Sequence, residues 1–255
     1  MKLPVVVIGI GEIGSVLARG LLRCGYPVYP ATRANDMALL AEHLPEPMAV
    51  VVAVGEGDIA AVLVQLPPVW RSKIVLLQNE LLPRDWLKNG LQDPTVISIW
   101  FEKKSGQDVK VLIPSPIYGA HANLIADALA SLNIPTKIVA DSAALLFELV
   151  NKNVYILTTN IAGLVCGGTV EALLNQHRDL MQAVADDVID IQRYLTGEPL
   201  DVTALMQGFQ TAVHGDLQHK CMGRSAPARL RRALTIADET GLAVPKLRAV
   251  AEEKL

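Results

Sequence analysis

Short apolar runs alternate with amphipathic segments over the first 140 residues of the chain. Residues 3–8 (LPVVVI) and 48–54 (MAVVVAV) are continuously apolar and rich in β-branched side chains, which predicts strands buried on both faces of a sheet. Between these runs, the apolar residues of segment 12–25 recur at helical spacing, and Gly25 is well placed to end that helix. A second short strand is predicted at 27–33.

The same alternation continues to residue 140. We expect a helix over 58–66 with Asp58 as its N-terminal cap, and antiparallel strands at the edge of the sheet on either side of Gly106. The other predicted elements are strands at 73–79 and 136–140 and a helix at 121–133. Alternating strands and helices are typical of an α/β fold with a Rossmann-type doubly wound parallel sheet.

The pattern changes at Asp141, a capping residue that opens a long helical segment ending in Gly167 and Gly168. No strand is predicted beyond it. Helical periodicity instead covers segments 177–195, 202–218 and 227–241. The chain is therefore expected to have an N-terminal α/β domain at 1–140 and a C-terminal all-helical domain at 141–255.

Composition and charge narrow the class of partner. The formal net charge is −3, which argues against nucleic acid or an anionic membrane as the main partner. The three cysteines lie far apart, and the five histidines include no H-x-x-x-H pair, so we predict no metal site and a reducing, cytoplasmic location. No apolar run reaches the length of about 20 residues that spans a bilayer, and the first apolar run favours a buried strand over a signal peptide.

The sequence GIGEIG at 9–14 lies between the first predicted strand and the first predicted helix, the context of a dinucleotide-binding turn. Gly9 would permit the tight turn, Gly11 the close approach of a pyrophosphate, and Gly14 the packing of the helix against the sheet. The N–H groups of the helix start would face the phosphates. We expect Gly9, Gly11, Glu12, Ile13 and Gly14 to contact the cofactor, although a glycine-rich turn without a ligand is the alternative.

The residues after the second strand indicate which dinucleotide binds. NAD sites usually carry an acidic residue there, whereas this chain has Ala31, Thr32 and Arg33. Arg33 suits a 2′-phosphate, and Thr32 could hydrogen-bond to it. These residues predict NADP as the cofactor. The alternative is that Arg33 is a solvated loop residue that binds no ligand.

Several stretches along the whole chain resemble one enzyme family. They are GIGEIG, Arg33, LLQNE at 76–80, ELVNKNVYILTTN at 148–160, LQHKCMGR at 217–224 and TGLAVP at 240–245. In these stretches the chain resembles the ketopantoate reductases, which are NADPH-dependent 2-oxo-acid reductases with a Rossmann domain followed by a helical domain. The resemblance implies that 1–140 binds NADP and that 141–255 binds a small-molecule substrate and forms a homodimer.

The resemblance also implies site residues. Lys152 matches the catalytic lysine of the family, Asn160 matches an asparagine two turns later, and Asn79 matches an asparagine near the nicotinamide. The chain departs from the family at Ile156, where the family has another asparagine, and at Gly55 and Glu56, near which the family has a lysine.

Two further departures lie near the C-terminus. Residues 225–227 (SAP) provide no carboxylate where the family has a glutamate, and His214 and Gly215 replace a substrate-binding serine. This loss puts the reaction on ketopantoate itself in doubt.

Reduction of a ketone requires a proton or a positive charge at the forming alkoxide, and Lys152 could supply both. Thr159 is expected on the same helix face as Lys152, with Asn160 at its edge, and both are predicted to bind the substrate. The alternatives are a lysine that snorkels to the surface and, for Asn79, a turn residue at a strand end.

A basic cluster could bind a substrate carboxylate or a phosphate, although such clusters are often solvated helix faces. It comprises His214, His219, Lys220 and Arg224. Arg229, Arg231 and Arg232 are expected at the surface.

Two functions follow from these residues. The first is an NADPH-dependent reductase of a small 2-oxo acid or related carbonyl compound. The second is a catalytically degenerate NADP-binding protein with a regulatory or partner-binding role, which the missing glutamate favours.

Overall fold

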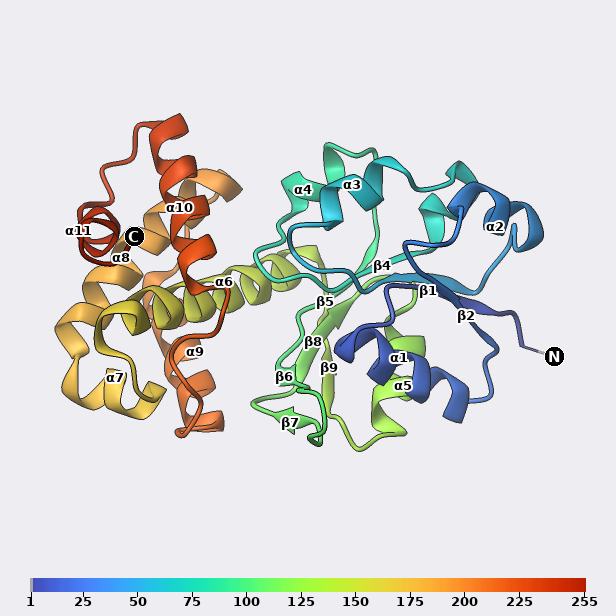
Figure 1. The fold of residues 1–255 in the computed structure, drawn as a ribbon, viewed down its shortest axis with the longest axis horizontal. Helices are drawn as coiled ribbons and strands as arrows, with labels where there is room; N and C mark the ends of the chain where they lie inside the picture. Colours follow the sequence, from blue (N-terminus) through green and yellow to red (C-terminus); the bar gives the residue numbers. More distant parts are fainter. Residues whose placement is uncertain (1) are drawn as a thin grey trace. The chain divides into compact units, whose positions relative to one another are not determined.

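A computed structural model describes residues 2–255 (Figure 1). The chain forms two compact units, unit 1 up to Leu149 and unit 2 from Val150 to Leu255. The division lies inside a helix that begins at Ser142, one residue after the sequence pattern changes. Within unit 1 the architecture is α/β and within unit 2 it is helical, so the predicted fold class is confirmed.

The core of unit 1 is a seven-stranded sheet in the order β2-β1-β3-β4-β5-β8-β9. All neighbouring strands are parallel except β5 and β8, which are antiparallel. The strands are β1 (Val5–Ile8), β2 (Val28–Ala31), β3 (Ala49–Val52), β4 (Ile74–Leu76), β5 (Thr95–Ile97), β8 (Ser115–Tyr118) and β9 (Thr136–Ile138). Strands β1 and β3 are fully buried, as expected for apolar strands covered on both faces.

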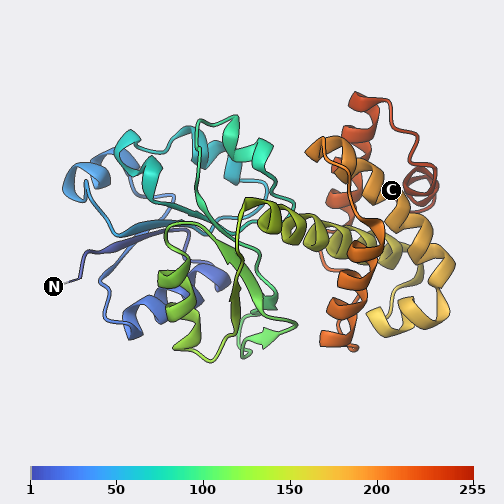
Figure 2. The same cartoon turned by 180° about the vertical axis from the view of Figure 1, so that it is seen from behind.

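Helices cover both faces of this sheet. Figures 1 and 2 show α1 (Glu12–Arg23) and α5 (Ala122–Ala130) on one face, and α2 (Met37–His43), α3 (Ile59–Val64) and α4 (Pro83–Leu87) on the other. Helices α2 and α4 and the short 3₁₀ helix at Pro68–Lys73 were not among the elements predicted from the sequence.

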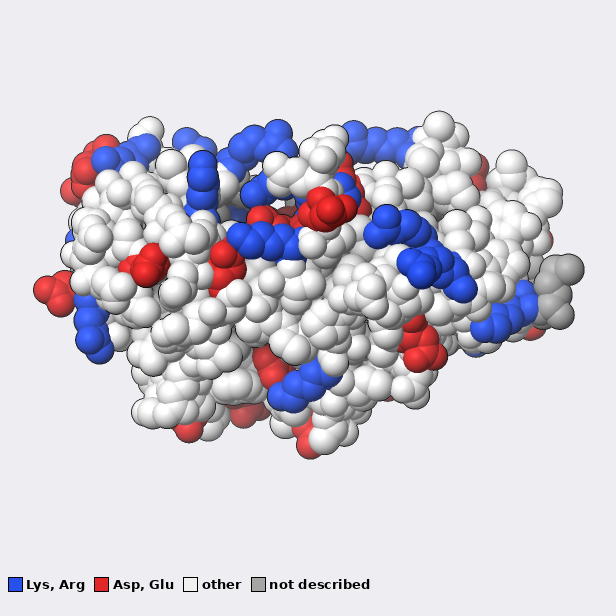
Figure 3. All heavy atoms as spheres, turned by 90° about the horizontal axis from the view of Figure 1, so that it is seen from below, with Lys and Arg blue, Asp and Glu red and all other residues white. Residues whose placement is uncertain are grey.

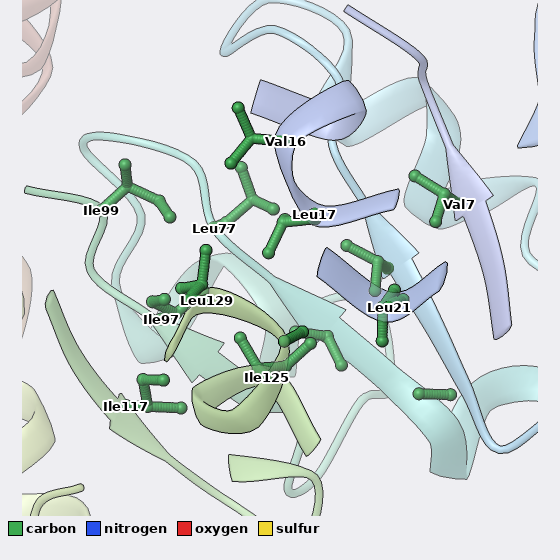
Figure 4. Close-up of a cluster of buried hydrophobic side chains, with 14 of the residues drawn as sticks. Val7, Val16, Leu17, Leu21, Leu77, Ile97, Ile99, Ile117, Ile125 and Leu129 are labelled. Carbon is green, nitrogen blue, oxygen red and sulfur yellow. The ribbon is translucent and has the colours of Figure 1, made fainter. Parts of the chain in front are cut away.

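A hydrophobic cluster joins α1 and α5 to the sheet. Leu17 and Leu21 of α1 meet Ile125 and Leu129 of α5 in this cluster, together with apolar residues of the strands (Figure 4). The two helices pack backbone to backbone, because a side chain at Gly20 would overlap the carbonyl group of Ala128. Burial of each such Leu or Ile side chain stabilises the fold by roughly 1.5–3 kcal/mol, and the cluster fixes the start of α1 relative to the strand ends.

The prediction for the strands around Gly106 was only partly right. They are antiparallel, but β6 (Phe101–Glu102) and β7 (Lys110–Val111) form a separate two-stranded ribbon rather than the edge of the main sheet. Strand β8 occupies the free edge of β5, so the ribbon residues pair with each other. Phe101 is then buried in the cluster of α1 and α5, and the partly buried Val109 and Val111 pack against it.

Unit 2 is built from helices, and residues 150–255, all of which are described, include no named strand. Helix α6 starts in unit 1 and continues through unit 2. The helices are α6 (Ser142–Cys166), α7 (Val170–Gln176), α8 (Arg178–Thr196), α9 (Val202–Gly215), α10 (Ala226–Thr240) and α11 (Pro245–Lys254), of which α7 and α11 were not predicted. Left-handed Gly197 and Gly241 end α8 and α10, as glycine C-caps do.

The exposed charges are mixed in sign. On the face drawn in Figure 3, acidic and basic side chains are interspersed among uncharged atoms. Among residues 2–255, no helix has both the length and the apolar character needed to cross a bilayer.

Candidate cofactor site

A pocket of about 540 Å³ opens in unit 1 at the carboxyl ends of β1, β2 and β3. Strand β1 lies between β2 and β3, so the chain passes to opposite sides of β1 at this point. Ligands of open α/β sheets bind at such switch points. The lining residues come from the three strand ends, the loops after them, the start of α2 and helix α3; they are Ile8–Gly11, Ala31–Arg33, Asn35, Met37, Ala53–Gly55, Asp58, Ala61, Val62 and Gln65.

The three glycines of the turn differ in what surrounds them. Gly9 has φ of 92°, and a side chain there would meet the Ala53 carbonyl oxygen at 2.8 Å. A side chain at Gly14 would overlap the carbonyl oxygen of Gly9, so α1 lies directly against the turn. Gly11 has no atom within 4 Å of the position that a side chain would take. The turn therefore leaves open space at Gly11, where a pyrophosphate would need it.

The start of α1 can receive an anion. Gly11 is its N-cap and provides no side-chain hydrogen bond to the helix, so the first N–H groups and the positive end of the helix dipole face outward. Glu12 would repel an anion here, but the Lys103 ammonium lies 3.4 Å from its carboxylate and compensates its charge. Lys103 follows the β6 strand and was not predicted as a site residue. Ile13 is half-buried and packs against the hydrophobic cluster.

The loop after β2 is organised by one asparagine. The side-chain oxygen of Asn35 accepts hydrogen bonds from the Thr32 backbone N–H at 2.8 Å and from the Thr32 hydroxyl at 2.9 Å. The Thr32 hydroxyl is thus already used within the loop. Asn35 also lines the pocket, and its NH₂ group is the donor that it could offer to a ligand there. Sequence reasoning missed Asn35, although a Thr-x-x-Asn turn is a local signal that could have found it.

Arg33 and Asp58 form an ion pair at the pocket. The Arg33 guanidinium donates to the Asp58 carboxylate over 3.1 Å, and both residues line the pocket. Asp58 occupies the N-cap position of α3, as predicted. Its side chain, however, makes no capping hydrogen bond to the helix. The carboxylate turns to Arg33 instead.

Asn79 lies beyond the end of β4 and does not line this pocket. Its NH₂ group donates to the Glu56 carboxylate over 2.8 Å, so the chain has an acid next to Asn79. The neighbouring Gln78 is buried and donates to the carbonyl oxygens of Val52 and Val54, which ties the end of β4 to the end of β3. Asn79 is therefore held at the carboxyl edge of the sheet by the residues around it.

The predicted substrate residues Thr159 and Asn160 are both buried in unit 2. The Thr159 hydroxyl donates to the Tyr155 carbonyl oxygen at 2.8 Å. The Asn160 amide donates to the Cys221 carbonyl oxygen at 3.1 Å, and its oxygen accepts from the Arg229 guanidinium at 2.7 Å. These bonds join α6 to α10 and to the loop before it.

The expectation that Arg229 lies at the surface is wrong, since its exposed fraction is 7%. Its position on α10 is the reason. Arg229 falls at helical spacing between Ala226, Leu230 and Ala233, all of which are buried, so it shares the apolar stripe of that helix. The stripe was visible in the sequence and could have revealed this placement.

The other predicted residues of unit 2 differ in exposure and in their hydrogen-bond partners. His214 is exposed in the last turn of α9, where its Nδ1 contacts the Gln210 carbonyl oxygen at 2.7 Å. Arg224 is exposed in the loop before α10, and Lys152 is half-buried on α6. His219 is the histidine that reaches α6, and its Nδ1 lies 2.9 Å from the Tyr155 hydroxyl.

Two observations concern the side chains that could bind a metal ion or act as thiol nucleophiles. In residues 2–255, no group of three or more His, Cys, Asp or Glu side chains is placed to hold a metal ion. Burial raises the pKa of the Cys221 thiol to about 12, with Cys166 adding to the rise. Burial also raises the pKa of Cys166. Both thiols are therefore poor nucleophiles near neutral pH.

Comparison with known proteins reveals similarity in structure alone. No protein-family model matches the sequence, and no curated protein matches it. Among solved structures, 2-dehydropantoate 2-reductase from Methylococcus capsulatus is 14% identical with a TM-score of 0.69, covering 97% of this chain and 94% of its own.

Two further structures extend this comparison. A dimeric ketopantoate reductase from Staphylococcus aureus is 16% identical with a TM-score of 0.68, covering 97% of this chain and 96% of its own. A D-mandelate dehydrogenase in complex with NADH is 13% identical with a TM-score of 0.67, covering 100% and 97%. The chain thus has the fold of the ketopantoate reductases, and the resemblance noted in its sequence is confirmed at the level of the fold.

Proposed function

We propose that the protein is an NADPH-dependent reductase of a small 2-oxo acid or a related carbonyl compound. The observation that carries the proposal is the pocket of unit 1, where a glycine turn, an uncapped helix start and Arg33 converge on the switch point of the sheet. In this proposal residues 1–140 bind NADP, and residues 141–255 bind the substrate and form a homodimer. The small-molecule substrate and the cofactor are its main ligands, without nucleic acid or membrane.

The residues of the pocket fit a dinucleotide. The space at Gly11 and the first N–H groups of α1 would hold the pyrophosphate. Arg33 and the NH₂ group of Asn35, whose side chain Thr32 holds in place, would bind the adenosine 2′-phosphate. A pocket of about 540 Å³ is within the usual size of cofactor sites, roughly 300–1,000 Å³.

When bound, the reduced nicotinamide supplies a hydride to the carbonyl carbon of the substrate. Lys152 donates the proton that the resulting alkoxide oxygen needs. Asn79 acts as an orienting group at the sheet edge, because its NH₂ group is held by Glu56 and its oxygen is thereby turned to accept a donor from the ligand. These roles rest on the resemblance to the ketopantoate reductases.

The substrates of the structurally similar enzymes support a 2-oxo acid as the substrate class. Ketopantoate reductases act on a 2-oxo acid, and the mandelate dehydrogenase acts on a 2-hydroxy acid, which is the reduced form of such a compound. One neighbour is dimeric, which supports the homodimer.

A specific observation favours a second candidate, a catalytically degenerate NADP-binding protein. Asn160, proposed as a site residue, has its amide bonded to Arg229 and Cys221 in the interior. Ser225, Ala226 and Pro227 also offer no carboxylate to assist Lys152.

The test is NADPH oxidation with a panel of 2-oxo acids that includes ketopantoate. We expect weak or no turnover of ketopantoate and faster turnover of another member of the panel. Lys152→Ala should lower kcat by about 10²–10⁴ while NADPH affinity is retained. Lys254→Ala is the matched control, because Lys254 is exposed at the end of α11 and pairs with its neighbour Glu253.

Three outcomes would count against parts of the proposal. Fast turnover of ketopantoate would show that the missing carboxylate matters little. Unchanged kcat in Lys152→Ala would remove the assigned proton donor. Tight NADPH binding without turnover of any substrate would favour the degenerate alternative.

A further inference from the structure

Asp58 pairs with Arg33, the side chain to which the proposed function assigns the recognition of the 2′-phosphate. We propose that Asp58 is a specificity-determining residue, which limits the preference of the site for a 2′-phosphorylated cofactor and gives NAD(H) a partner in the same pocket. This inference rests on the proposed function and concerns the adenosine end of the cofactor. It is carried by residues of unit 1 alone.

The conformation of Asp58 is the first argument. An aspartate at an N-cap normally accepts hydrogen bonds from the first N–H groups of its helix. Asp36 does so at the start of α2, where its carboxylate accepts from Ala38 and Leu39. Asp58 has the same position at the start of α3 but makes no such bond, and its carboxylate lies 3.1 Å from the Arg33 guanidinium.

Charge is the second argument. Arg33 is the only basic side chain among the described residues that line the pocket, and Asp58 is the only acidic one. The pair is therefore close to neutral before a cofactor binds. A 2′-phosphate brings about two negative charges, which Arg33 attracts and Asp58 repels.

The exposure of the pair allows this exchange of partners. The side chain of Arg33 is 91% exposed and that of Asp58 is 54% exposed. Ion pairs between exposed side chains are weak. Arg33 can therefore exchange the Asp58 carboxylate for the phosphate as its ion-pair partner. Asp58 then remains in the pocket as an unfavourable neighbour of the phosphate.

The same carboxylate suits the other cofactor. A ribose 2′-hydroxyl is a hydrogen-bond donor, and NAD sites hold it with an acidic side chain at the end of the second strand. That position is Ala31 to Arg33 in this chain. Asp58 brings an acid to the same pocket from the loop after β3. The site thus contains a partner for the phosphate and a partner for the hydroxyl.

The experiment is calorimetric titration of the full chain with NADP⁺ and NAD⁺, and with 2′,5′-ADP and AMP as probes of the adenosine end. Asp58→Asn should raise the NADP⁺ to NAD⁺ affinity ratio about fivefold, because it removes the competitor for Arg33. The 2′,5′-ADP to AMP ratio should rise by a similar factor. Arg33→Ala should abolish the preference for the phosphorylated ligands.

Two further variants distinguish loss of the Asp58 carboxylate from a change in net charge and from a disturbance of helix α3. Asp93→Asn makes the same change in net charge at an exposed residue of unit 1 outside the pocket, and it should leave both ratios unchanged. Asp58→Ser also removes the carboxylate, and it keeps a good N-cap if Asn disturbs α3. It should raise the ratios as Asp58→Asn does.

The results distinguish this inference from the proposed function. Ratios that are unchanged in both Asp58 variants, with NADP⁺ binding intact, would overturn the role of Asp58 and leave the reductase proposal standing. An equal rise in Asp93→Asn would also overturn it, since the effect would come from net charge. Failure of the wild type to bind either dinucleotide would overturn both.

Discussion

The polar side chains of unit 1 and unit 2 are used in opposite ways. Around the pocket of unit 1, the principal ion pair joins two exposed residues, Arg33 and Asp58, and the anion site is made largely of backbone. In unit 2, Asn160 and Arg229 are both buried, and each is bonded to the other. An exposed pair can exchange its partner for a ligand at little cost, whereas a buried pair cannot.

This contrast separates groups suited to binding from groups suited to holding a fold. The same unit 2 interior contains a second buried bond, in which the Asn153 amide donates to the Gln192 side chain over 3.0 Å and links α6 to α8. We therefore expect substitutions around the pocket to change ligand affinity more than stability, and substitutions in the unit 2 network to do the reverse.

The largest effect is expected within the glycine turn itself, where two neighbouring glycines should behave differently. Gly14→Ala should destabilise the protein by about 3 kcal/mol, because its Cβ would overlap the backbone of Gly9 and neither element can give way. Gly11→Ala should leave stability within about 0.5 kcal/mol, since its φ of −80° suits alanine and the space around it is open. Denaturant unfolding of both variants measures the difference.

Cofactor titration of the Gly11 variant sharpens this result. The added methyl group would occupy the space assigned to the pyrophosphate, so NADPH affinity should fall at least about tenfold, or 1.4 kcal/mol. A stable Gly11→Ala protein with wild-type affinity would show that the phosphates do not bind at this turn.

An intermediate effect is expected in unit 2. Arg229→Ala should lower the free energy of unfolding by about 2 kcal/mol, because it leaves the buried oxygen of Asn160 without this donor. Arg231→Ala, on the exposed face of the same helix, is the control and should change stability by less than about 0.5 kcal/mol. Urea unfolding curves of the two variants provide the comparison.

Cofactor binding by the folded Arg229 variant completes this test. We expect its NADPH affinity to match the wild type, because Arg229 belongs to unit 2 and the pocket to unit 1. If Arg229→Ala were as stable as wild type, the buried network would not have the structural role inferred for it.

The smallest effect is a change in pH dependence caused by Asp187. This carboxylate is buried on α8, and burial raises its pKa above 3.8 even though it accepts hydrogen bonds from the Lys246 and Leu247 backbone N–H groups. The folded protein therefore binds the proton more tightly than the unfolded chain does. The free energy of unfolding that the Asp187 carboxyl contributes is fully present below pH 3.8. It is lost as the pH rises through the folded-state pKa.

Thermal unfolding at a series of pH values tests this prediction. The stability of the wild type relative to Asp187→Asn should fall as the pH rises from 3.8 through the folded-state pKa and should be flat above it. Asp179→Asn, at an exposed position of the same helix, should not reproduce this trend. A difference that instead grows with pH would mean that the two N–H bonds outweigh burial.

Much of unit 1 could be predicted because its signals are local. The apolar strands, the spacing of the first glycines and the helix that follows them lie within about one βαβ unit, and each depends on residues close in sequence. The short helices α2 and α4 were missed, whereas the similarly short α3 was predicted because a continuous apolar run follows its N-terminal residue Asp58. The β6–β7 ribbon was misplaced because β8, a later strand, takes the edge of β5.

The sequence by itself determined that the chain begins with a dinucleotide-type strand, turn and helix, that an arginine follows the second strand, and that helices replace strands after residue 141. It could not determine the partners of the charged and amide side chains. Arg33 and Asp58 are 25 residues apart and meet because the sheet order sets β2 and β3 on either side of β1. Asn160 and Arg229 are 69 residues apart and meet because the fold of unit 2 brings the Arg229 side chain of α10 to α6. Local propensity acts between neighbours in the chain, while such pairs depend on which elements the packed fold makes adjacent.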